Sequence, residues 1–123
     1  MLVIFDSLTG QTKKFAQKLG FECMHIKTYE GLPKDEIFLI TRSFNFGEIP
    51  KTTKDFLSQY AKDVVGVAVS GNRNWGTNYG RAGDLIEKQY DIPLILKFEA
   101  SGFNQDVLYV KEWIDNFVAR KGE

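Results

Sequence analysis

Four short and almost continuous apolar runs constrain the fold of this chain more than any other feature. They cover residues 2–5, 36–41, 64–69 and 92–98. A strand that is buried on both faces of a sheet has this pattern, because neither face is reserved for polar residues. A further run at 21–26 is weaker and mixed in polarity, so we expect it to form a strand at the edge of the same sheet.

Helical patterns occupy most of the intervals between these runs. Apolar residues recur there at spacings of three and four, as on one face of an amphipathic helix. Thr52 and Asp55 have the spacing of a capping box, which predicts the start of the second helix. Between 27 and 35 we expect only a turn. The four helical faces are defined by Phe15 and Leu19; by Phe56, Leu57, Tyr60 and Ala61; by Ala82, Leu85, Ile86 and Gln89; and by Val107, Val110, Ile114 and Phe117.

Strands that alternate with helices predict an α/β fold, in which helices cover both faces of a parallel sheet. Five strands in 123 residues favour a flavodoxin-like three-layer sandwich with a five-stranded parallel sheet of order 2-1-3-4-5. At about 150 residues per domain, we expect residues 1–123 to form a single domain.

Charge and cysteine content argue against several classes of protein. Lys plus Arg and Asp plus Glu both total 16, so the formal net charge is zero, whereas a nucleic-acid-binding protein usually has a basic excess. Cys23 is the single cysteine, which favours a buried thiol in a reducing compartment. His25, the single histidine, is not expected to bind a metal. No apolar run approaches the roughly 18 residues of a membrane span, so we expect a cytoplasmic protein with no nucleic-acid or membrane partner.

Ligands of open α/β sheets bind beyond the carboxyl ends of the strands, where the strand order reverses. The loops after the first, third and fourth strands meet at that place. The first of them, residues 7–12, has three hydroxyls and Gly10 at the entry to a helix. Such an entry suits a phosphate, although an ordinary capped turn uses the same residue types. Neither the Walker A pattern nor the dinucleotide glycine pattern is present.

The other two loops contain aromatic side chains. Residues 42–50 include Phe44 and Phe46; we expect one of them to face a planar ligand and the other to pack against the core. Residues 70–80 combine three glycines and three asparagines with two large aromatic residues, which suits a ring-binding loop better than a merely flexible one. A phosphate cradle beside two ring walls fits flavin mononucleotide (FMN) better than a dinucleotide.

These loops resemble those of the NrdI family, small flavodoxin-like activators of ribonucleotide reductase. Ser7-x-Thr9-Gly10-x-Thr12 is similar to the phosphate loop of flavodoxins. The more specific match is Ser70-Gly-Asn-Arg-Asn-Trp-Gly76 with Arg81-Ala-Gly-Asp84, followed by Pro93-x4-Phe98-Glu99-x-x-Gly102-x-x-x-Asp106-Val107. The resemblance covers nearly the whole chain.

The resemblance implies a noncovalently bound FMN. The first loop would hold the phosphate, the second would line one side of the isoalloxazine, and the third would line its other side and the N5 edge. The residues assigned in this way are Ser7, Leu8, Thr9, Gly10, Gln11, Thr12, Ser43, Phe44, Asn45, Phe46, Gly47, Gly71, Asn72, Arg73, Trp75, Gly76, Asn78 and Tyr79.

The resemblance also implies a role for the flavin. Reduced FMN would react with dioxygen, and the superoxide or peroxide product would oxidise the dimanganese centre of NrdF, the small subunit of class Ib ribonucleotide reductase. That oxidation would help to generate the tyrosyl radical. A flavin or flavodoxin reductase, or a similar electron donor, would reduce the FMN. In this role the protein is an accessory activator without an organic substrate of its own.

Two other functions stay open on the sequence. A flavodoxin that carries single electrons would share the cofactor and most loop residues, but the Asn-Arg-Asn-Trp block, the short chain and the lack of net acidity argue against it. A cofactor-free receiver-like signalling domain would share the strand order, and Lys97 would suit it. That domain needs a phosphorylatable Asp after the third strand, where this chain has Thr41-Arg42-Ser43, and an acidic pair near the end of the first strand, where Asp6 stands alone.

Two departures from related patterns lead to predictions. Phe103 follows Gly102 where NrdI proteins commonly have threonine, so we expect Asn104 to cap the last helix instead.

Arg73 lies in the ring-binding loop and Arg81 follows it, in a chain without the strong acidity of typical flavodoxins. Positive charge favours the more reduced, anionic flavin, so we expect full two-electron reduction to be easier than in a typical flavodoxin.

Overall fold

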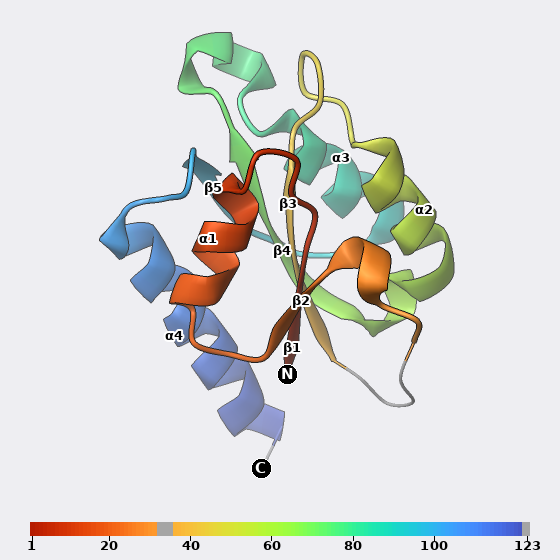
Figure 1. The fold of residues 1–123 in the computed structure, drawn as a ribbon, viewed down its shortest axis with the longest axis vertical. Helices are drawn as coiled ribbons and strands as arrows, with labels where there is room; N and C mark the ends of the chain where they lie inside the picture. Colours follow the sequence, from red (N-terminus) through yellow and green to blue (C-terminus); the bar gives the residue numbers. More distant parts are fainter. Residues whose placement is uncertain (32–35, 122–123) are drawn as a thin grey trace.

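The fold is a five-stranded parallel sheet between two layers of helices (Figure 1). A computed structural model describes residues 1–31 and 36–121. The strand order is β2-β1-β3-β4-β5, and all four neighbouring pairs are parallel, which confirms the predicted order. The strands are β1 (Leu2–Phe5), β2 (Cys23–His25), β3 (Ile37–Arg42), β4 (Val64–Gly71) and β5 (Leu94–Glu99).

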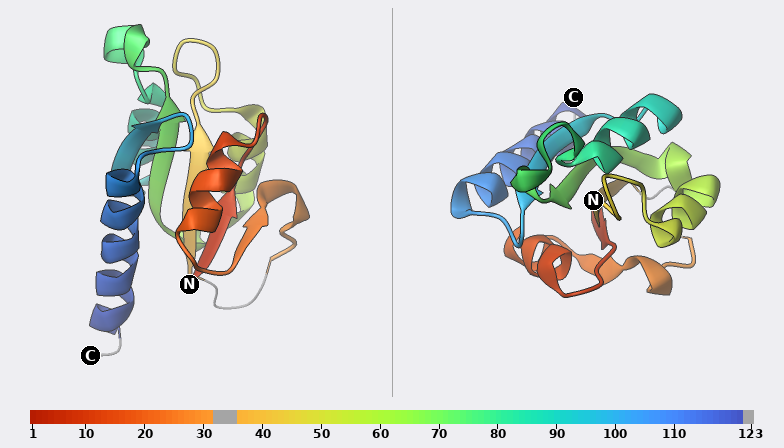
Figure 2. Two further views of the ribbon diagram at one scale, coloured as in Figure 1. Left: turned by 60° about the vertical axis from the view of Figure 1, so that its left-hand side comes forward. Right: turned by 90° about the horizontal axis from the view of Figure 1, so that it is seen from above.

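The helices cover both faces of the sheet, as Figure 2 shows from the side and from above. Helices α1 and α4 pack on one face, and α2 and α3 pack on the other. The α-helices are α1 (Gln11–Lys18), α2 (Lys51–Tyr60), α3 (Arg81–Tyr90) and α4 (Asn104–Lys121). Three short 3₁₀ helices lie in the connections: η1 (Ile26–Thr28) between β2 and β3, η2 (Ala61–Asp63) between α2 and β4, and η3 (Arg73–Asn78) between β4 and α3.

The sheet divides the core into two halves, and β1 contributes to both. Val3 and Phe5 pack on the side of α1 and α4, while Leu2 and Ile4 pack on the side of α2 and α3. Successive side chains of a strand point to opposite faces, so a central strand needs apolar residues at every position. This is the physical reason for the continuous apolar runs in the sequence.

The run at 92–98 differs from this expectation. Strand β5 begins at Leu94, and only Phe98 within it is fully buried. The other side chains are half-buried because β5 is at the edge of the sheet and pairs only with β4 within the described chain. Its apolar character suits its two packing faces, but no strand of residues 1–31 and 36–121 pairs with its outer side.

The predicted capping box at Thr52 and Asp55 is wrong. Helix α2 begins two residues earlier than a Thr52 cap would place it, at Lys51, with Pro50 at the N-cap. Thr52 is therefore already helical, and its hydroxyl donates a hydrogen bond to the Asp6 carboxylate. The carboxylate of Asp55 accepts from Lys51 Nζ at 3.1 Å instead of capping the helix.

The connection between β2 and β3 contains a turn, as expected, within its described part. It consists of η1, where the His25 ring accepts a hydrogen bond from the Lys27 amide at 3.1 Å. Residues 32–35, which belong to the same predicted connection, lie outside the described residues. Across 1–31 and 36–121, none of the helices combines the length and apolarity that crossing a bilayer requires.

Candidate functional site

A pocket of about 540 Å³ opens at the carboxyl ends of β1, β3 and β4. In Figure 1 the loops that follow these three strands gather at the upper end of the sheet. A volume of this size is within the range of small-molecule and cofactor sites. The pocket is lined by Ser7, Leu8, Thr9, Gln11, Thr12, Arg42, Ser43, Ser70, Gly71, Asn72 and Trp75.

The loop between β1 and α1 is folded as a cradle at a helix N-terminus. Gly10 is the N-cap of α1 with φ +91°, a conformation that favours glycine. Its amide donates to Ser7 Oγ at 2.9 Å, and the Thr12 hydroxyl donates to the Asp6 carbonyl at 2.7 Å. A Cβ added at Gly10 would meet no atom within 4 Å in the described chain. The loop is thus held by its own hydrogen bonds around open space.

A buried ion pair lies beneath this cradle. The Asp6 carboxylate is 2% exposed, and Arg42 Nη2 lies 3.7 Å from its Oδ1. Its Oδ2 accepts hydrogen bonds from the hydroxyls of Thr52 and Thr53, the latter at 2.6 Å. Because the Thr53 hydroxyl already donates its hydrogen bond to Asp6, Thr41 is the donor to Thr53 Oγ1, at 2.7 Å. Three segments distant in sequence, at residues 6, 41–42 and 52–53, are tied together at the end of the sheet.

The loop after β3 contradicts the expectation that Phe44 or Phe46 packs on the core. Phe44 is 46% exposed and Phe46 is 73% exposed. Phe44 and Glu48 form reciprocal backbone hydrogen bonds of 2.7 Å, with Asn45 and Gly47 at positive φ between them. This tight hairpin extends beyond the sheet, so its tip cannot reach the core. The Phe46 ring approaches that of Trp75, with centroids 6.2 Å apart.

Gly47 has a steric role in this hairpin. A Cβ at this position would lie 2.6 Å from Arg81 Cβ and 3.1 Å from the Asn78 carbonyl oxygen. Together with its φ of +106°, this close approach requires glycine. Gly47 and Asn78 therefore join the second and third loops and do not line the pocket themselves.

The loop after β4 is the 3₁₀ segment η3, fixed at its start by two hydrogen bonds. The Arg73 amide donates to Glu99 Oε2 at 3.0 Å, and the Asn74 amide donates to Asn72 Oδ1 at 2.9 Å. Gly76 interrupts the helical geometry with φ +57° and ψ −121°. These constraints hold the half-buried Trp75 side chain against the pocket.

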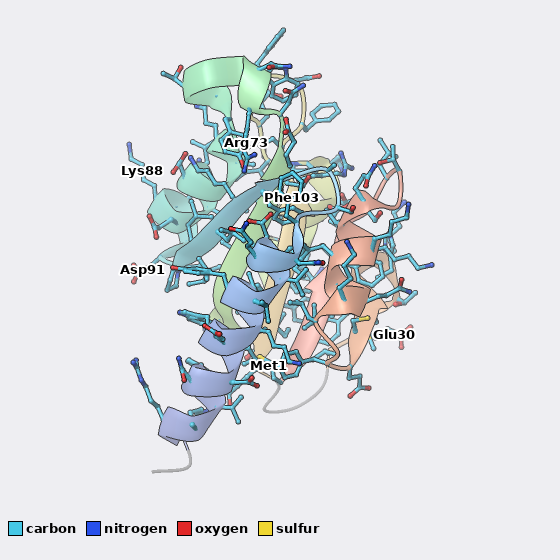
Figure 3. All side chains as sticks on the ribbon, turned by 90° about the vertical axis from the view of Figure 1, so that its left-hand side faces the viewer. Met1, Glu30, Arg73, Lys88, Asp91 and Phe103 are labelled. Atoms are coloured by element: carbon cyan, nitrogen blue, oxygen red, sulfur yellow. The ribbon has the colours of Figure 1, made fainter. Side chains whose placement is uncertain are left out.

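Tyr79 ends this loop with its ring beneath a cation. The Arg73 guanidinium carbon is 5.8 Å from the centroid of the Tyr79 ring, within the range of a cation–π contact. The Tyr79 hydroxyl is buried and has no hydrogen-bond partner within the described chain. Figure 3 labels Arg73 and shows it toward the opposite end of the molecule from Met1, at the end where the pocket opens.

The structure brings only part of the predicted residue set to the pocket wall. Ser7, Leu8, Thr9, Gln11, Thr12, Ser43, Gly71, Asn72 and Trp75 line it. The other predicted residues lie in the same three loops without lining the pocket: Gly10, Phe44, Asn45, Phe46, Gly47, Arg73, Gly76, Asn78 and Tyr79.

Sequence reasoning missed Arg42 and Ser70, which also line the pocket. Arg42 is the last residue of β3 and is paired in register with Ser70 of β4. The rule that ligands bind at the carboxyl ends of strands could have found both, because each stands at or near such an end.

The N-terminus of α4 is also different from the expectation. Asn104 is the first helical residue and does not cap the helix. The Phe103 carbonyl accepts from the amides of Asp106 and Val107, so Phe103 itself occupies the N-cap position. Asp106 Oδ2 accepts from the Phe103 amide at 2.7 Å. This is one half of a capping box whose other half, a hydroxyl at 103, is replaced by a phenyl ring.

His25 and Cys23 lie on β2, away from the pocket wall. His25 Nε2 lies 3.2 Å from the Ser7 carbonyl oxygen, so its ring supports the end of the first loop. Cys23 is half-buried, not fully buried as expected, because β2 is an edge strand. Its side chain packs against the half of the core beneath α1 and α4.

Comparison with known families decides between the proteins that share this fold. A family model described as NrdI flavodoxin-like matches residues 3–112. The chain belongs to the NrdI flavodoxin-like family. It is 44% identical over 108 residues to Protein NrdI of Macrococcus caseolyticus, covering 87% of this chain and 83% of the relative. It is 38% identical over 118 residues to Protein NrdI of Bacillus licheniformis, covering 96% and 90%.

Solved flavodoxins share the fold of this NrdI-family chain at low sequence identity. A short-chain flavodoxin associated with a bacterial microcompartment has a TM-score of 0.76 at 15% identity, covering 97% of this chain and 96% of that one. Flavodoxin 2 from Bacillus cereus has a TM-score of 0.64 at 19% identity, covering 97% of each chain. A Fusobacterium nucleatum flavodoxin bound to flavin mononucleotide has a TM-score of 0.61 at 14% identity, covering 97% and 96%.

NrdI family membership and the flavodoxin-like fold imply a flavin, and the residues present fit one. Gly76, like Gly10, adjoins open space that a Cβ would enter without meeting another atom of the described chain within 4 Å. Arg42 lines the pocket, and its buried Nε is a polar atom whose partner the described residues do not supply. Trp75 offers an indole face in the wall. A ligand with polar edges and an aromatic ring meets these requirements.

Proposed function

We propose that this protein binds FMN in the 540 Å³ pocket and uses it to activate a class Ib ribonucleotide reductase. The observation that supports the proposal most directly is the hydroxyl-lined α1 entry within the same pocket as Trp75. The amides and hydroxyls of 7–12 would bind the phosphate, because helix N-termini bind anions. Ser43 of the second loop, and Gly71, Asn72 and Trp75 of the third, would contact the two sides of the isoalloxazine.

In this proposal the protein chiefly controls access and charge around the flavin. The FMN held by these loops would, once reduced, supply electrons to dioxygen, and the superoxide or peroxide so formed would oxidise the dimanganese centre of NrdF. The exposed ring of Phe46 and the half-buried Trp75 would leave one edge of the site open to oxygen and a partner. Arg73 and the zero net charge of the chain would lower the electrostatic cost of adding the second electron.

A flavodoxin that carries single electrons is the second candidate, because its fold and cofactor are the same. Two features of this chain favour the activator. The Asn-Arg-Asn-Trp block places a cation in the ring loop, and the chain has no net negative charge. A receiver-like domain has less support, since Lys97 pairs with Asp84 at 2.7 Å and Asp6 pairs with Arg42.

The first test is FMN binding followed by anaerobic reductive titration. Trp75 lines the pocket, whereas Trp113 packs against Phe38 and Phe117 in the α4 layer. FMN should therefore quench the fluorescence of wild type and of Trp113→Phe, and the quenching should be mostly lost in Trp75→Phe. If neither absorbance nor fluorescence detects FMN binding, the proposal is wrong.

The second test separates the activator from the electron carrier. Reduced protein, manganese-loaded NrdF and dioxygen are mixed, and the tyrosyl radical is measured by electron paramagnetic resonance. Radical formation that requires both the reduced flavoprotein and dioxygen supports activation. A titration dominated by the one-electron form, with no radical formed in NrdF, would instead identify an electron-carrying flavodoxin.

A further inference from the structure

Arg42 is a cationic side chain in the pocket wall that the NrdI resemblance does not assign. Its side chain is 22% exposed, and its Nη2 lies 3.7 Å from Asp6 Oδ1. Its Nε is buried and finds no hydrogen-bond partner among residues 1–31 and 36–121. A guanidinium has five N–H donors in a planar fork. A single ion-pair contact uses few of these donors, so most of them can donate hydrogen bonds to a ligand in the pocket.

The position of the guanidinium indicates which end of a flavin it would contact. Arg42 begins at the carboxyl end of β3, and its Nη2 reaches across to β1. The partner there, Asp6, directly precedes the hydroxyl loop at 7–12, and its carbonyl accepts the Thr12 hydroxyl. The charged end of Arg42 therefore lies beside the residue that leads into the phosphate cradle, in the same pocket as the hydroxyls of that loop.

The negative charge of Asp6 requires a cation nearby if an anion is to bind in the adjacent loop. A buried carboxylate beneath an anion-binding loop repels the anion, and this repulsion is strong where water is excluded. Thr52 and Thr53 satisfy Oδ2 with hydrogen bonds but add no charge. Arg42 neutralises Asp6 and still has donors to offer, in the planar geometry that matches phosphate oxygens.

We propose that Arg42 binds the phosphate of the flavin, that Asp6 positions its guanidinium, and that the pair makes the pocket selective for FMN over riboflavin. This inference rests on the proposed flavin function. It goes beyond the loop at 7–12, since it adds a side-chain cation from a different strand.

The test compares the dissociation constants of FMN and riboflavin for matched variants. Arg42→Gln should weaken FMN binding about 10- to 100-fold and change riboflavin binding less than about threefold. Arg42→Lys should recover part of the loss, because it keeps the charge without the planar fork. Lys14→Gln is the control: Lys14 is exposed on α1 and does not line the pocket, and its loss changes the net charge equally.

A second measurement covers a failure of Arg42→Gln to fold, since that change leaves Asp6 buried without its cation. The double variant Asp6→Asn/Arg42→Gln removes both charges and should show the same selective loss of FMN affinity. Inorganic phosphate should raise the melting temperature of the wild-type apoprotein and of Lys14→Gln, but raise that of the double variant much less. Equal weakening of FMN and riboflavin, or an equal effect of Lys14→Gln, would overturn the inference while leaving the flavin function intact. Failure of wild type to bind either flavin would overturn the proposed function itself.

Discussion

A threonine at position 103 should complete the capping box at the start of α4. Phe103 holds the N-cap position, and Asp106 already accepts its amide at 2.7 Å. A hydroxyl at 103 would accept from an amide of the first turn, at Gln105 or Asp106. The matched comparison is Phe103→Thr against Phe103→Val, because these side chains have nearly the same shape and differ in the hydroxyl.

The expected difference follows from the local geometry. Phe103 is 63% exposed, and both variants lose the same ring contacts, which therefore cancel in the comparison. The variants then differ in the hydroxyl cap, which only the threonine variant can form and which contributes about 1 kcal/mol to the free energy of unfolding. For a chain of this size that corresponds to a melting temperature roughly 3–5 °C higher for the threonine variant. Figure 3 labels Phe103 where the chain enters α4.

Urea denaturation of the two apoproteins, followed by circular dichroism, measures the difference. The two variants should unfold with the same m-value, since the surface exposed on unfolding is unchanged. If the threonine and valine variants are equally stable within about 0.3 kcal/mol, the hydroxyl makes no cap and the assignment of Phe103 as N-cap is wrong.

Three further predictions concern the pocket end of the sheet. Thr53→Val should lower the free energy of unfolding by about 2 kcal/mol in urea denaturation, because the fully buried hydroxyl that donates to Asp6 is lost; a change below 0.5 kcal/mol would contradict it. Gly10→Ala should cost about 1–2 kcal/mol in the same assay from its φ of +91° alone, since no atom of the described chain obstructs the added Cβ. Arg73→Glu should lower the potential of the second flavin electron, by on the order of 40 mV for a difference near 1 kcal/mol, in anaerobic spectroelectrochemistry. An unchanged potential would show that Arg73 does not influence the flavin.

The layers of the fold could be predicted from sequence because their signals are local. A central strand needs apolar residues on both faces, and the runs at 2–5, 36–41 and 64–69 meet this need with β1, β3 and β4 buried as expected. The run at 92–98 has the same apolar pattern, but most of β5 is only half-buried, at the sheet edge where the predicted strand order already placed it. A continuous apolar run indicates that helices cover both faces of a strand. It does not indicate whether another strand pairs with each of its two edges.

The two wrong helix starts have a related cause. Thr52-x-x-Asp55 has the spacing of a capping box, but the Thr52 hydroxyl bonds to Asp6, 46 residues away. Asn104 has the residue type of a cap, but the backbone places Phe103 there. The N-cap is the residue that the backbone places just before the first helical turn. Which residue this is depends on how the helix packs on the sheet.

The strand order, the three loops that would meet, and the family to which the loops are similar could all be predicted from the amino-acid sequence. These follow from hydrophobic periodicity and from short motifs whose residues are neighbours in the chain. Only the tertiary structure revealed that both phenylalanines of the second loop are exposed and that Arg42 and Ser70 line the pocket. It also paired Asp6 with Arg42 across two strands. Such contacts arise when the parallel strands align their carboxyl ends, and no spacing along the chain encodes the distance between side chains on different strands.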